Sequence, residues 1–104
     1  MSQPELVFLA PGPDGIAELV VNFGVYSSRQ ATPAEVERLA RRLLEDVAAV
    51  EIVCEQRYEF TPEAEATVYR VRVTVPGAGH RVAELRDTVA AWAEDCIEER
   101  HVAP

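Results

Sequence analysis

The sequence predicts an α+β fold: a two-layer sandwich in which a four-stranded antiparallel sheet carries two helices on one face. The first observation is the order of elements, because two predicted strands and a helix are followed by two more strands and a second helix (ββαββα). The second is size, since 104 residues that are 48% hydrophobic and 27% charged suit one core. We therefore expect a single domain over residues 1–104, with a flexible tail at 100–104.

The first quarter of the chain predicts two strands joined by a turn. Residues 6–9 form a short apolar run, and residues 11–15, rich in proline and glycine, follow as a turn. Residues 16–26 predict the second strand, because apolar and other side chains alternate along it. The residues on its apolar face are Leu19, Val21, Phe23 and Val25.

Residues 32–49 predict the first helix. Thr32 is a suitable N-cap, Pro33 fits the first helical position, and Glu35 completes a capping box. Apolar residues then recur three and four positions apart, as on the buried face of a helix. They are Val36, Leu39, Ala40, Leu43, Leu44 and Val47.

The second half predicts two more strands, at residues 50–60 and 66–75, with a turn at 61–63 between them. Residues 81–99 predict the second helix. Its apolar stripe is formed by Val82, Leu85, Val89, Trp92 and Cys96. Because the chain has two cysteines and no CxxC spacing, we expect Cys54 and Cys96 to be buried thiols, with a disulfide between them as the alternative.

Two arrangements compete for the middle of the sheet. Strands joined by short turns pair antiparallel, so the first pairs with the second and the third with the fourth. Either the fourth strand then lies between the second and third, giving the order 1-2-4-3, or the third lies directly beside the second. The fourth strand is rich in β-branched residues and has no internal proline, which favours the central position. This topology resembles a ferredoxin-like sheet whose last edge strand has moved to the N-terminus.

The face of the sheet away from the helices, called here the open face, is predicted to mix apolar and charged residues. It has three possible uses: a solvated lattice of Arg–Glu pairs, a homodimer interface, or the floor of a ligand pocket. The apolar positions expected in an interface are Val20, Val53 and Val68. The polar groups expected around a ligand are Asn22, Tyr26, Arg57, Arg70 and Arg72.

Two short segments before the helices are candidate anion sites. Ser27, Ser28 and Arg29 offer two hydroxyls and a guanidinium near the first helix, a combination that binds carboxylate or phosphate. Residues 77–80 lead from a strand into the second helix but lack the third glycine of a dinucleotide fingerprint. The two histidines, at 80 and 101, are predicted at opposite ends of the domain, so we expect no metal, no cofactor and no catalytic residues.

Charge narrows the function classes. The formal net charge is −8, which disfavours binding to nucleic acid or to anionic membranes and suits a basic protein partner. All ten basic residues are arginines, so lysine Schiff-base chemistry and a P-loop lysine are excluded. No apolar run approaches the ~20 residues of a membrane span, and the start has no basic leader, so we expect a cytoplasmic protein.

These observations predict a non-enzymatic binding or regulatory module that forms a homodimer through the open face. One alternative is a small ferredoxin-like enzyme or small-molecule-binding protein that uses this face as its pocket floor. A second alternative is an acidic inhibitor or immunity-type protein that covers a basic partner.

Overall fold

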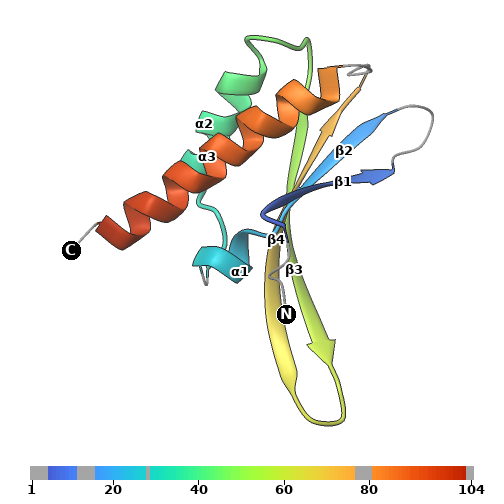
Figure 1. The fold of residues 1–104 in the computed structure, drawn as a ribbon, viewed down its shortest axis with the longest axis vertical. Coiled ribbons are helices and arrows are strands. Elements are labelled where there is room, and N and C mark those ends of the chain that lie inside the picture. Colours follow the sequence, from blue (N-terminus) through green and yellow to red (C-terminus); the bar gives the residue numbers. More distant parts are fainter. Residues whose placement is uncertain (1–4, 12–15, 28, 77–80, 103–104) are drawn as a thin grey trace.

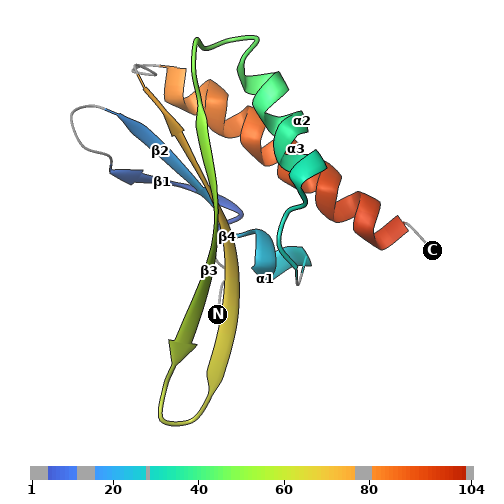
Figure 2. The same cartoon turned by 180° about the vertical axis from the view of Figure 1, so that it is seen from behind.

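A computed structural model describes residues 5–11, 16–27, 29–76 and 81–102. It contains one four-stranded antiparallel sheet in the order β1-β2-β4-β3, which confirms the predicted sandwich and strand order (Figures 1 and 2). The strands are β1 (Val7–Pro11), β2 (Ala17–Val21), β3 (Glu51–Phe60) and β4 (Glu65–Val75). The helices are α1 (Phe23–Ser27), α2 (Pro33–Leu43) and α3 (Val82–Val102).

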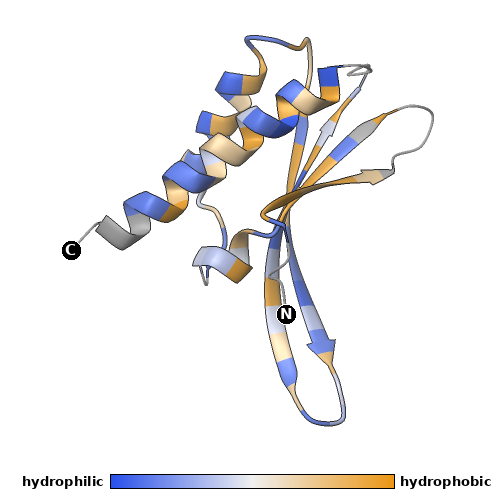
Figure 3. Cartoon of the chain, viewed as in Figure 1, coloured by the Kyte–Doolittle hydropathy of each residue, from blue (hydrophilic) through white to orange (hydrophobic). Residues whose placement is uncertain are grey.

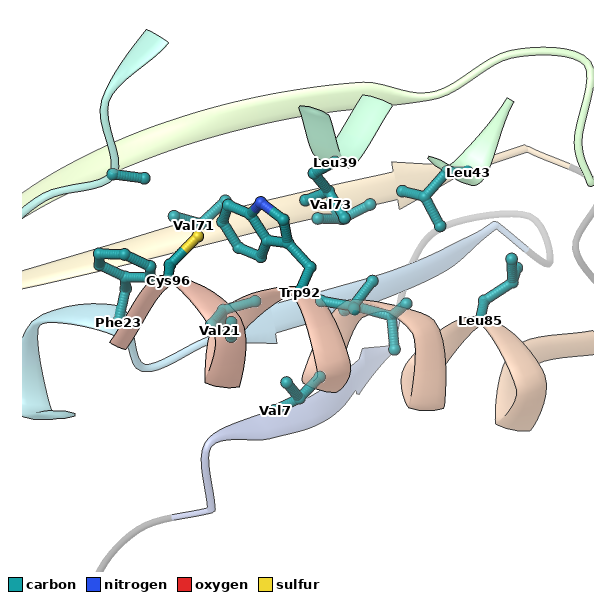
Figure 4. Close-up of a cluster of buried hydrophobic side chains, with 14 of the residues drawn as sticks. Val7, Val21, Phe23, Leu39, Leu43, Val71, Val73, Leu85, Trp92 and Cys96 are labelled. Atoms are coloured by element: carbon teal, nitrogen blue, oxygen red, sulfur yellow. The ribbon is translucent and has the colours of Figure 1, made fainter. Parts of the chain in front are cut away.

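The core lies between one face of the sheet and the two longer helices, which Figures 1 and 2 show on the same side of the sheet. Trp92 and Phe23 are fully buried there, with their ring centroids 5.7 Å apart. Burial of each such side chain stabilises the fold by roughly 1.5–3 kcal/mol. The other residues labelled in this cluster are Val7, Val21, Leu39, Leu43, Val71, Val73, Leu85 and Cys96 (Figure 4).

The second predicted strand is only half correct. The structure ends β2 at Val21, and the residues that follow form α1, a third helix where the sequence pattern predicts strand. Asn22 lies at the break and is bound to the residues just before β1: its backbone N–H donates to the Leu6 carbonyl (2.8 Å) and its side-chain amide donates to the Glu5 carbonyl (2.7 Å). Phe23 is buried as expected, whereas Val25 is exposed.

A close backbone contact holds α1 against β4. A Cβ added to Gly24 would lie 2.8 Å from the backbone nitrogen of Tyr69, a separation that real Cβ atoms do not reach. Glycine therefore allows α1 to lie where a longer β2 would have continued to pair with β4. The Ser27 hydroxyl donates to the Phe23 carbonyl (2.7 Å) and closes this single helical turn.

The first long helix begins as predicted and ends early. Thr32 caps α2, and the capping box with Glu35 is complete. The helix ends at Leu43 rather than near residue 49. After it the hydrogen bonds shorten to three-residue turns, in which Glu45 donates to the Arg42 carbonyl (3.4 Å) and Asp46 to the Leu43 carbonyl (2.9 Å). At the other end of the chain, α3 continues to Val102, into the segment predicted to be flexible.

The strand lengths produce a projection. β2 pairs with β4 only between Val21–Val71 and Ala17–Val75, whereas β3 and β4 stay paired as far as Phe60 and Glu65. Residues 55–70 therefore form a two-stranded extension, called here the hairpin arm, which Figure 1 shows reaching away from the helices. Figure 3 shows hydrophobic residues concentrated in the strands beside α3 and interspersed with hydrophilic ones along the arm. Within the described residues, no helix has the length and apolar character needed to span a membrane.

Candidate interaction surface on the hairpin arm

An ion-pair network occupies the centre of the open face. Arg72 on β4 contacts Glu18 on β2 (2.7 Å) and Glu55 on β3 (3.1 Å), so one guanidinium joins three strands. The hydrogen bond from Arg72 to Glu18 raises the pKa of the guanidinium further above its usual range. Beside it, Arg70 Nε donates to Asn22 Oδ1 (3.1 Å). Two of the three arginines predicted as ligand groups, Arg70 and Arg72, thus bind side chains of the chain itself.

The three apolar positions predicted for an interface differ in accessibility. Val20 lies between Phe8 of β1 and Arg72 of β4 and is only 1% exposed. Val68 is half-buried, and Val53 on β3 is 44% exposed. Only Val53 and Val68, both on the β3–β4 hairpin, therefore offer surface to another molecule.

The structure does not bring the five predicted ligand groups together. Asn22 is buried, and Tyr26 lies on α1 rather than on the open face. Tyr26 instead lines a surface hollow of about 520 Å³ with Ile97 and two glutamates of α3. The expectation that Tyr26 faces out from a strand is wrong because that segment is helical. Arg57 lies farther out, on the hairpin arm.

Arg29, predicted as part of an anion site, is bound by a carboxylate of its own chain. Its Nη1 and Nη2 donate to Glu35 Oε1 and Oε2, both at 2.8 Å, and its guanidinium lies 5.3 Å from the centre of the Phe23 ring. This pairing lowers the pKa of Glu35 to about 2. The Ser27 hydroxyl is occupied by backbone contacts, and Ser28 lies outside the described residues. An external anion would therefore compete with Glu35.

The cysteines are both free, and only one is buried as predicted. Burial raises the pKa of the Cys96 thiol to about 11, although Arg38 Nη2 donates to its sulfur (3.4 Å) and lowers that pKa. Cys96 is therefore a protonated core residue near neutral pH. Cys54 is exposed, because it lies on edge strand β3 where the helices do not cover it.

The described part of the chain contains no group of three or more His, Cys, Asp or Glu residues arranged to hold a metal ion. His80, and with it residues 77–80 of the second candidate anion site, lies outside the described residues. The separation predicted for the two histidines therefore stays a prediction.

The hairpin arm carries the most exposed aromatic side chains of the described residues. Tyr58 is 63% and Phe60 is 72% exposed, although their alternation with charged residues predicted an apolar face. Both lie on the side of the sheet that the helices cover nearer the core, but the arm extends beyond the helices. They line a surface hollow of about 430 Å³ with Glu65, Ala66 and Thr67.

The outer edge of β3 is unpaired in the described structure, since β3 ends the strand order. The side chains Glu55, Arg57 and Glu59 alternate along its open face. Glu55 contacts Arg72, whereas Arg57 forms no ion pair with any described residue. The β3 edge thus combines free backbone groups, exposed aromatics and an unpaired cation.

Sequence reasoning found the alternation of the arm but not its exposure. The exposure depends on where β2 stops, which differs from the predicted boundary. Gly24 and Asn22, inside a run of apolar residues, were the local signal that the second strand would stop early. Comparisons with protein-family models, with curated proteins and with solved structures gave no match for this chain.

Proposed function

We propose that this protein is a non-enzymatic protein-interaction module that assembles as a homodimer through its hairpin arm. The observation that supports this proposal is the exposure of Tyr58 and Phe60 on the outer part of the arm, which extends beyond the helices. Aromatic side chains that are exposed together on a compact chain are typical of contact surfaces, where they supply much of the binding energy.

The open face gives less support to an interface at its centre. At the centre of that face, the Arg72 guanidinium already contacts two carboxylates, and the apolar side chain of Val20 is buried. Removing such a charge network from water costs free energy that a new contact would have to offset. The proposed interface therefore uses the arm of the same sheet, and Val53, on β3 just before the arm, remains accessible.

A basic protein partner is the second candidate, favoured by the formal net charge of −8. The two candidates differ in salt dependence. Association with a basic protein weakens as salt screens the attraction, whereas an aromatic homodimer contact persists.

The experiment compares the solution mass of the Tyr58→Ser/Phe60→Ser variant with that of the unaltered chain, by light scattering over a concentration series. We expect the unaltered protein to be dimeric and the variant to shift to monomer. Because both side chains are exposed within one chain, the free energy of unfolding of the monomer should change little.

A matched control is Val25→Ser, which removes an exposed apolar side chain from α1, outside the arm. This control should remain dimeric. If the Tyr58→Ser/Phe60→Ser variant dimerises as strongly as the unaltered chain, the arm is not the interface.

A further inference from the structure

We propose that the arm binds a second copy of this chain through antiparallel pairing of the two β3 edges, centred on Gln56. This inference rests on the proposed function and specifies its interface. The two sheets would join into one eight-stranded sheet related by a two-fold axis at Gln56. Unpaired strand edges supply the backbone hydrogen bonds for this kind of association.

The sheet geometry restricts the possible registers. Directly opposite residues in an antiparallel pair share a face of the sheet. A two-fold arrangement that keeps both helical layers on one side must therefore be centred on a residue rather than between two residues. Within the middle of β3 the possible centres are residues 54 to 58.

Charge complementarity favours the centre at Gln56. In that register Arg57 of each copy lies opposite Glu55 of the other, which gives each guanidinium one carboxylate partner and forms two symmetric pairs across the interface. Centring on Arg57 would place two guanidinium groups opposite each other. Centring on Glu55 would place two carboxylates opposite each other. Like charges opposite each other on neighbouring strands are unfavourable.

Apolar contacts and strand length separate the remaining registers. With Gln56 at the centre, residues 52–60 of both copies pair, and the exposed Tyr58 and Phe60 lie opposite Cys54 and Ile52 of the second copy. Centring on Cys54 would place Tyr58 opposite a residue beyond the start of β3. Centring on Tyr58 would leave only five residues of β3 paired, up to Phe60.

Charges on an edge strand ordinarily prevent uncontrolled pairing. On β3 they have that effect in the registers centred on Arg57 and on Glu55, which bring like charges together. The registers centred on Cys54, Gln56 and Tyr58 all place Arg57 opposite a glutamate, and strand length with the apolar contacts favours Gln56 among these three. The two-fold axis closes the assembly at two copies.

Disulfide trapping tests this register. In a Cys54→Ser/Gln56→Cys variant the two introduced thiols lie directly opposite each other, so mild oxidation with diamide should give a covalent dimer that a reductant dissolves. In the unaltered protein the two Cys54 residues are offset by four positions, about 13 Å along the strands, which is too far for a disulfide. A Cys54→Ser/Arg41→Cys variant, with its thiol on α2, controls for random collision.

Charge exchange tests the register independently. Arg57→Glu alone and Glu55→Arg alone each place like charges at both pairs and should weaken the dimer by roughly tenfold or more. A mixture of the two variants restores opposite charges at both pairs, and mixed dimers should form with the affinity of the unaltered chain. Arg41→Glu is the control for net charge. Unfolding curves of each variant check its stability, since Glu55 also contacts Arg72.

The outcomes separate this inference from the proposed function. A dimer that is not trapped at Gln56→Cys, or in which Cys54 crosslinks more readily, overturns the register and leaves the dimeric module standing. A dimer whose affinity is unchanged in both charge variants also overturns the register and leaves the dimeric module standing. A monomer at every concentration overturns both, and leaves the arm to a partner of another kind.

Discussion

Glu35 joins the connector before α2, the start of α2 and α3. Its carboxylate accepts two hydrogen bonds from Arg29 and one from the backbone N–H of Thr32, and its carbonyl accepts one from the Trp92 indole (2.8 Å). The connector and the start of α2 thus meet at the Glu35 side chain, and the middle of α3 is bound by its backbone carbonyl. The predicted capping box identified Glu35 as a local cap, but its long-range partners follow only from the packing of the helices.

Glu35→Gln should therefore destabilise the fold in a pH-dependent way. The pKa of Glu35 is lowered from 4.5 to about 2 in the folded chain, mainly by the hydrogen bond with Arg29. Its stabilisation is complete above the unfolded pKa and is lost as the pH falls from about 4.5 towards 2. We expect the variant to lose roughly 2–3 kcal/mol at pH 7 and to show a flatter stability profile below pH 4.5. Urea unfolding at several pH values measures this.

The control for that substitution is Glu37→Gln, which removes an exposed carboxylate from the same helix. It should leave the stability at pH 7 within about 0.5 kcal/mol of the unaltered chain, because exposed ion pairs contribute little. Equal losses in the two variants would contradict the role assigned to Glu35.

Gly24→Ala should destabilise the chain by about 1–3 kcal/mol, because the added Cβ meets the backbone of Tyr69, which has little room to move. Denaturant unfolding followed by Trp92 fluorescence measures the loss. Val25→Ala, at an exposed neighbouring position, is the control and should change stability little. A Gly24→Ala variant as stable as this control would show that α1 does not press on β4 as described.

At the scale of elements, the sequence predicted most of the strands and helices and missed one boundary that shapes the surface. Alternation located β3 and β4 closely, and the capping box located the start of α2. The alternation of residues 19–25 also predicted a longer second strand, but the hydrogen bonds of Asn22 and the contact at Gly24 replace its end with α1. Those contacts join residues far apart in the chain, so periodicity alone does not reveal them.

The candidate surface was less predictable for the same reason. Tyr58 and Phe60 have the alternating pattern of buried residues, and only the relative lengths of β2 and β3 leave them exposed. The pattern identified the face on which they lie. Whether other elements cover that face depends on how the strands and helices pack together, which the alternation does not reveal.

The outer part of the arm, residues 58–67, should be dispensable for folding. Arg57 and Val68 are directly paired, so an Asn-Gly turn in place of residues 58–67 would close a shorter hairpin in the same register. We expect the shortened chain to keep its free energy of unfolding within about 1–2 kcal/mol, because the removed side chains are exposed, and to be monomeric. Far-ultraviolet circular dichroism with urea unfolding measures the first expectation. A chain that fails to fold would show that the arm belongs to the core.

In the whole molecule, the part that stabilises the fold and the surface proposed for contact lie in different places. The helices and the centre of the sheet enclose the buried side chains, while the arm extends the sheet beyond them with a free edge (Figure 2). The net charge of −8 on each copy opposes close approach, so a dimer of this chain needs a local contact strong enough to offset the repulsion. The exposed aromatics and the Arg57–Glu55 pairs of the proposed interface provide such a contact.

The solution mass of the unaltered protein tests this account most directly. Light scattering over a concentration series, at low and at high salt, should give twice the 11.5 kDa of one chain, and the dimer should persist at both salt concentrations because screening also reduces the repulsion between the copies. A mass of 11.5 kDa at every concentration and both salt levels would contradict the proposed homodimer.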